Sequence, residues 1–106
     1  MSPEVLALEN ESEALKNEGK NEEAIAKLQS ALELDDKFAR GHLAIAMLYM
    51  KTGAHEKAVE HGELAFKLDP DDLGAAALSM IYQQAFEATR DPKFIQKAEG
   101  VNTNLR

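Results

Sequence analysis

Two stretches of this chain repeat each other at an offset of 34 residues. The stretch from Gly53 to Pro70 carries glycine, alanine, leucine and aspartate where an earlier stretch carries the same residues. The matched pairs are Gly19 and Gly53, Ala24 and Ala58, Ala31 and Ala65, Leu34 and Leu68, and Asp35 and Asp69. A period of this length in a helix-forming sequence is typical of stacked helix pairs. Such an array offers an extended surface for holding another polypeptide.

The composition favours an all-α fold. The chain of 106 residues is rich in alanine, leucine, glutamate and lysine, and it has only six glycines and three prolines. Residues of the first kind are good helix formers, whereas glycine and proline interrupt helices. The length suits one domain over residues 1–106 with a modest hydrophobic core. We therefore predict a single helical repeat array.

The repeat boundaries predict about six helices. Two clear helix-turn-helix units cover about residues 5–36 and 39–72, and a divergent third pair covers 73–100, followed by a tail over 101–106. In the third unit the 34-residue register fails, because Glu87 and Pro92 stand where Gly53 and Ala58 have their matches. We expect the last helix to begin at Pro92 and to end near Gly100, with the tail frayed.

Charge and composition exclude several functions. The formal charge of −7 lies entirely in residues 1–36, which hold ten acidic and three basic residues, so no basic stripe for nucleic acid is present. The absence of cysteine excludes disulfides and thiolate chemistry. No apolar run is long enough for a membrane span, and the first residues lack the pattern of a signal peptide. A cytoplasmic protein without membrane contact is the expectation.

Residues with chemical potential form no recognisable catalytic or metal motif. His55 and His61 are six residues apart and fall on different sides of a helix, and we expect His42 to pack in the core. The acidic run that includes Glu9 and Glu13 reads as a solvated helix face rather than an acid–base pair. No phosphate-binding loop or catalytic triad is recognisable. We predict no enzyme activity, no cofactor and no metal.

The second unit carries a familiar pattern of small and large residues. Its positions are Ile45, Ala46, Tyr49, Gly53, Ala58, Ala65, Asp69 and Pro70. This pattern resembles the tetratricopeptide repeat family, whose unit has a large and a small residue and an aromatic in its first helix, then two alanines and a closing proline. Small residues at Ala46, Ala58 and Ala65 would let the two helices cross closely, with Tyr49 filling the wedge between them.

Two positions depart from the family pattern. His42 stands where the family often has tryptophan, and Gly62 stands where it usually has a bulky residue. A glycine inside a helix costs about 1 kcal/mol in helix propensity and leaves a gap. Either a neighbouring helix comes unusually close at Gly62, or a side chain of another chain enters there.

The resemblance implies a curved stack in which the first helix of each pair lines a concave groove. In the second unit the exposed stripe of that helix is Arg40, Leu43, Met47 and Met50. The equivalent stripe is Leu6, Glu9, Glu13 and Lys16 in the first unit, and Gly74, Ala77, Ile81 and Gln84 in the third. The groove is thus expected to be acidic at one end and apolar in its middle.

Chaperone-binding members of the family hold a C-terminal carboxylate with a clamp of basic and asparagine residues. Here the clamp positions of the first unit hold Glu9 and Glu13, and the asparagine position of the second holds Ala44. The resemblance therefore argues against chaperone tails as partners. Methionines in an apolar stripe suit an amphipathic helix or hydrophobic segment instead, because methionine adapts its shape.

The function predicted is a non-catalytic interaction module that binds a peptide or amphipathic helix of another protein, with apolar contacts and a basic flank. The candidate binding residues are Glu9, Glu13, Arg40, Leu43, Met47, Met50, Ile81 and Gln84. Two alternatives remain open at this stage. The same apolar surface could join copies of the chain into a homo-oligomeric scaffold, or the segment after residue 89 could cover it.

Overall fold

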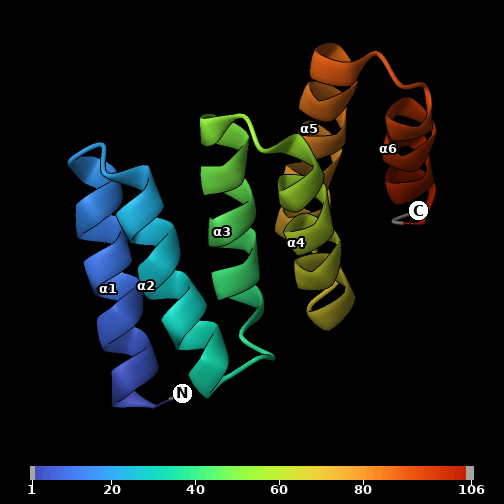
Figure 1. The fold of residues 1–106 in the computed structure, drawn as a ribbon. Helices are drawn as coiled ribbons and strands as arrows, with labels where there is room; N and C mark the ends of the chain where they lie inside the picture. Colours follow the sequence, from blue (N-terminus) through green and yellow to red (C-terminus); the bar gives the residue numbers. More distant parts are fainter. Residues whose placement is uncertain (1, 105–106) are drawn as a thin grey trace.

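Six helices are stacked in chain order in the computed structural model, which describes residues 2–104 and the side chains of residues 2–101. They are α1 (Pro3–Asn17), α2 (Asn21–Leu34), α3 (Ala39–Thr52), α4 (His55–Leu68), α5 (Asp72–Thr89) and α6 (Lys93–Asn104). Each helix packs against the next, and Figure 1 shows them as a row of helix pairs from α1 to α6. The described residues contain no strand. The all-α repeat array predicted from the sequence is confirmed.

Local chemistry sets several helix ends. The Oγ of Ser2 accepts a hydrogen bond from the backbone N–H of Val5 at 3.2 Å and caps α1. Gly53 ends α3 with a φ of 87°, a left-handed conformation that costs glycine little. Asp71 caps α5, where its Oδ1 accepts from the backbone N–H of Gly74 at 2.6 Å.

Burial decides two further helix ends. Helix α3 begins at Ala39, directly after Phe38, which turns into the core between α1 and α2 and is 4% exposed. The predicted end of the last helix near Gly100 is wrong, since α6 continues to Asn104. Val101 is 7% exposed and extends the apolar stripe of α6 that packs on α5, so helix continuation buries a valine. Residues 105 and 106 of the predicted tail lie outside the described residues.

Small residues lie at the helix crossings. Ala24, Ala31, Ala46 and Ala58 are completely buried, and each belongs to a hydrophobic cluster that joins neighbouring helices. A larger side chain at these positions would hold two helices apart. This agrees with the role that the sequence pattern predicts for them.

Helix α5 approaches α4 closely at Gly62. A Cβ atom placed on Gly62 would lie 3.0 Å from the Cδ1 of Ile81, 3.2 Å from the Cδ1 of Leu78 and 3.9 Å from the Cβ of Ala46. The first two distances are shorter than ordinary van der Waals contact. Of the two explanations for this glycine, the close neighbouring helix is the one observed.

Candidate protein-binding site

Two open clefts flank α3. The first, of about 210 Å³, lies between α1 and α3 and is lined by Ser12, Glu13, Lys16, Leu28, Ala44, Met47, Leu48 and Lys51. The second, of about 280 Å³, lies between α3 and the start of α5 and is lined by Ala39, Arg40, Leu43, Ala65, Asp69, Asp71, Leu73 and Gly74. Met47 and Leu43 are one helical turn apart on α3 and face one cleft each. We call these two clefts and the stripe between them the groove.

The structure brings four of the eight predicted binding residues to this surface. Leu43 and Met47 are half-buried and line the clefts, and Glu13 and Arg40 line them from exposed positions. Three further predicted residues do not line either cleft. Of these, Glu9 and Met50 are half-buried, and Gln84 is exposed on α5.

The predicted place of Ile81 on the open surface is wrong. Ile81 is 1% exposed and belongs to the core cluster that joins α3, α4, α5 and α6. It takes up the space that Gly62 leaves on α4, because its Cδ1 is the atom nearest to a Cβ built there. Within α5, Met80 is the exposed large apolar neighbour instead, with 38% of its surface exposed. Two sequence signals pointed to this inward turn: the unusual glycine on the facing helix, and the recurrence of Leu78, Ile81 and Ala85 at helical spacing.

The two acids expected to select a basic flank are bound to cations of the same chain. The guanidinium of Arg40 donates to both carboxylate oxygens of Glu9: its Nε donates to Oε2, and its Nη2 donates to Oε1 at 2.8 Å. The hydrogen bond to Glu9 raises the pKa of Arg40. Lys16 lies 3.0 Å from a carboxylate oxygen of Glu13, one helical turn away. The acidic end of the groove predicted from the sequence is therefore largely neutralised within the first two helix pairs.

Two histidines that the sequence pattern did not connect meet between α3 and α4. The Nδ1 atoms of His42 and His61 are 3.2 Å apart, and the Nε2 of His42 donates to the backbone carbonyl of Asp36 at 3.1 Å. Because that carbonyl can only accept, neutral His42 carries its proton on Nε2, and His61 must donate through Nδ1. Burial and the neighbouring His42 lower the pKa of His61, which Glu60 partly opposes. Burial of His42 in the core agrees with the prediction.

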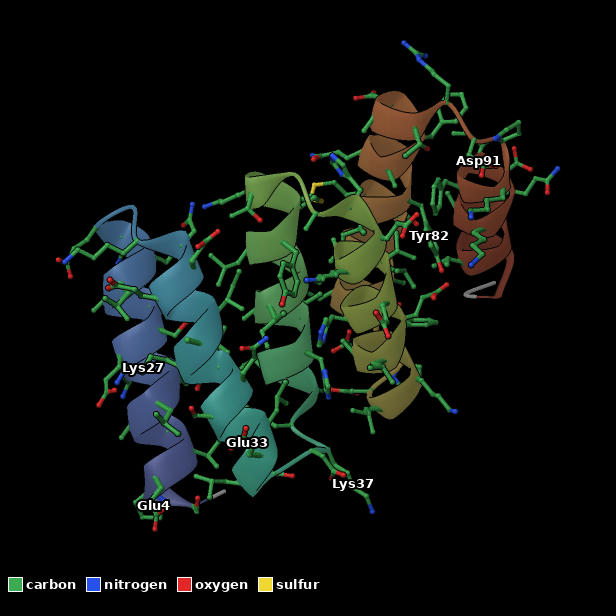
Figure 2. All side chains as sticks on the ribbon, in the orientation of Figure 1. Glu4, Lys27, Glu33, Lys37, Tyr82 and Asp91 are labelled. Atoms are coloured by element: carbon green, nitrogen blue, oxygen red, sulfur yellow. The ribbon has the colours of Figure 1, made fainter. Side chains whose placement is uncertain are left out.

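A polar contact ties the last three helices together. The hydroxyl of Tyr82 on α5 donates to a carboxylate oxygen of Glu63 on α4, and the Nζ of Lys97 on α6 donates to the same oxygen at 3.2 Å. Tyr82 lies on the side of α5 that faces α6, where its ring stacks on Phe94 (Figure 2). Burial and the bond to Glu63 raise the pKa of Tyr82 well above its ordinary value. This contact fixes the third helix pair onto the second.

The described residues hold neither a membrane-spanning helix nor a cluster of metal ligands. Within the described part of the chain, no helix is long and apolar enough to cross a membrane. The same residues contain no group of three or more histidine, cysteine, aspartate or glutamate side chains placed to hold a metal ion. The groove is accordingly the feature from which we derive a function.

A row of stacked helix pairs with clefts beside its first helices defines the class of helical repeat proteins that present a groove. Sequence patterns of this class match the chain. The pattern described as TPR repeat matches residues 13–53, and the pattern described as tetratricopeptide repeat matches residues 39–72. The chain belongs to the tetratricopeptide repeat family, as its sequence resemblance implied. Comparison with curated protein sequences gave no match.

Solved structures of the same fold agree with this assignment. The chain is similar to the TPR domain of Sgt2 from Aspergillus fumigatus, with a TM-score of 0.71 and 22% identity over 98% of this chain and 80% of that one. It is also similar to the first TPR of Spaghetti (RPAP3) bound to the HSP90 peptide SRMEEVD, with a TM-score of 0.68 and 17% identity over 99% of this chain and 95% of that one. At these identities the likeness establishes the fold alone.

Proposed function

We propose that the chain is a non-catalytic adaptor that binds a peptide or amphipathic helix of another protein in the groove. The observation that carries this proposal is the half-buried apolar stripe of α3, where Leu43 and Met47 each form part of a cleft wall. An apolar side chain of a partner would be removed from water on both sides of this stripe. Met47 would adapt to partners of irregular shape.

The partner we propose is not a chaperone tail. One structural neighbour holds the HSP90 peptide SRMEEVD, but this chain has Glu9, Glu13 and Ala44 at positions where the resemblance places the carboxylate clamp. Glu9 and Glu13 cannot donate a hydrogen bond to a carboxylate, and the cations beside them, Arg40 and Lys16, are already bound to these two acids. We instead propose apolar anchoring with a basic flank.

Substitution of Met47 by glutamate tests this proposal. The probe is a designed amphipathic peptide with leucines at helical spacing and lysines between them, labelled for fluorescence anisotropy. We expect Met47→Glu to weaken its binding by more than about tenfold, because an unpaired carboxylate would have to be desolvated in the cleft. Met80→Glu is the matched control, since it places the same charge on an exposed methionine outside both clefts. Equal affinity of wild type and Met47→Glu, with retained helical circular dichroism, would refute the groove as the binding site.

A homo-oligomeric scaffold is the second candidate. Exposed leucines away from the groove favour it, because Leu34, Leu64 and Leu68 are 56%, 40% and 40% exposed at the later turns of α2 and α4. Exposed apolar side chains would leave water if they packed against a second copy of the chain. Light scattering at two concentrations a hundredfold apart distinguishes the candidates. A stable dimer favours the scaffold, and a monomer at both concentrations removes it.

A further inference from the structure

The cleft between α3 and α5 has an apolar wall with room for a side chain. Leu73 stands at its edge with 74% of its surface exposed, and Leu43 on α3 forms the opposite side. Ala39 and Ala65, which also line this cleft of about 280 Å³, are too small to fill the space. A partner side chain placed between the two leucines would bury the most exposed large apolar side chain among the described residues.

The edge of this cleft carries uncompensated negative charge. Asp69 and Asp71 line it, Asp72 follows, and no ion pair is found for any of these three carboxylates within residues 2–101. The cation that lines the same cleft, Arg40, is bound to Glu9. The N-terminus of α5 contributes a partial charge of only about +0.5, which three carboxylates exceed.

The charge pattern of the groove is thus different from the one expected from sequence. The two groove acids of the first helix pair, Glu9 and Glu13, have cations of their own chain, whereas the described side chains provide no ion pair for the aspartates at the start of α5. A partner cation gains more from an unpaired carboxylate than from one already in an ion pair.

We infer that the bound segment places an apolar side chain between Leu43 and Leu73 and a neighbouring lysine or arginine against Asp69 and Asp71. This inference rests on the proposed function and specifies which residues of the groove contact the basic residues of the partner. It assigns the partner's chemistry as a basic, amphipathic segment, and it assigns the orientation of that segment, with its basic end at the start of α5.

Two designed amphipathic peptides test the inference with the full chain. Both carry leucines at helical spacing, one has lysines and the other glutamates at the remaining positions, and both have blocked ends so that no terminal carboxylate is present. We expect the lysine peptide to bind at least about tenfold more tightly at low salt, and we expect the difference to shrink in about 1 M salt, where the Debye length is about 3 Å.

Single asparagine substitutions identify the carboxylates that contact the partner's cations. Asp71→Asn removes one charge and keeps an oxygen that can cap α5, since asparagine and aspartate cap equally well. We expect Asp71→Asn and Asp69→Asn each to weaken the lysine peptide about two- to fivefold, in line with exposed ion pairs. Asp72→Asn is the matched control, because it removes the same charge beside the cleft without belonging to its lining, and it should leave affinity nearly unchanged.

The outcomes separate this inference from the proposed function. If both peptides bind equally and Met47→Glu abolishes binding, the groove stands and the inference is overturned. Equal effects of Asp71→Asn and Asp72→Asn overturn it as well. The lysine peptide would then be attracted by the negative charge of the whole region and not by the carboxylates that line the cleft. If neither peptide binds, both proposals are refuted. Binding of the glutamate peptide only with a free carboxyl end would reveal a tail-binding site and would also overturn the inference.

Discussion

The close approach of α5 to α4 can be tested by exchanging volume between Gly62 and Ile81. The Cδ1 of Ile81 lies 3.0 Å from the position of a Cβ on Gly62, and valine lacks that atom. Ile81→Val therefore vacates the space that Gly62→Ala would enter. The two substitutions should compensate each other, although each alone disturbs a core that is almost fully buried.

The expected free energies follow from this geometry. Gly62→Ala gains about 1 kcal/mol of helix propensity but costs about 1–3 kcal/mol in overpacking, because the terminal atoms of Ile81 and Leu78 that it meets belong to buried side chains. We expect a net loss of about 1 kcal/mol of unfolding free energy. Ile81→Val should also cost about 1 kcal/mol. The double variant should lie within about 0.5 kcal/mol of wild type, which is a favourable coupling of at least about 1.5 kcal/mol.

Urea unfolding followed by far-ultraviolet circular dichroism measures the unfolding free energy of wild type, the two single variants and the double variant. An unchanged slope of this free energy with urea concentration shows that the denatured states are comparable. Ile45→Val serves as the control partner, because Ile45 is fully buried in the cluster between α2 and α3. Gly62→Ala and Ile45→Val should be additive. If Gly62→Ala stabilises the chain by about 1 kcal/mol and shows no coupling to Ile81→Val, then α5 does not pack against Gly62 and the reasoning fails.

Three further perturbations concern the helix contacts. The chain should lose stability as the pH falls below about 6.5, because the lowered pKa of His61 means that the unfolded state binds more protons there. Urea midpoints at two pH values measure this, and His61→Gln, which removes the group paired with His42, should flatten the dependence. Tyr82→Phe should cost about 1–3 kcal/mol of unfolding free energy, because Glu63 loses a donor in a half-buried contact; no shift in the urea midpoint would contradict this. Val101→Asp should expose the amides of α6 to hydrogen exchange while those of α1 stay protected, and equal protection of α6 in both proteins would contradict the docking of that helix.

The parts of the fold that depend on local chemistry could be predicted from the sequence. Gly53 ends α3 and Ser2 caps α1, because each requirement is met by the residue itself and its nearest neighbours. The alanines at the helix crossings were also identified, since their 34-residue spacing repeats a packing requirement that is the same in both helix pairs.

The features that were missed depend on contacts between helices. The stripe of α5 was phased by continuing the repeat register, but the empty space at Gly62 turns Ile81 inward. The contact of His42 with His61 joins residues on two helices, so spacing along one helix gives no sign of it. In α6, burial of Val101 outweighs the weak helix propensity of the preceding glycine, because propensity is worth only about 1 kcal/mol.

The candidate site was predicted in outline and altered in its charges. Leu43 and Met47 line the clefts as expected, because their spacing along one helix decides which face they share. The pairing of Glu9 with Arg40 brings together residues 31 positions apart, and only the packing of α3 beside the first helix pair creates it. The charge of a groove therefore requires the structure even where its apolar stripe does not.

Amide chemical-shift mapping with the lysine-bearing amphipathic peptide tests the central claim most directly, because it reports where a partner contacts this chain. The groove account predicts that the largest shifts occur at the amides of Leu43, Met47, Leu73 and Gly74, on the two clefts beside α3. The same peptide should leave the exposed turns of α2 and α4 at Leu34 and Leu68 unshifted. Shifts concentrated on those turns, with none at Leu43 and Met47, would contradict the account.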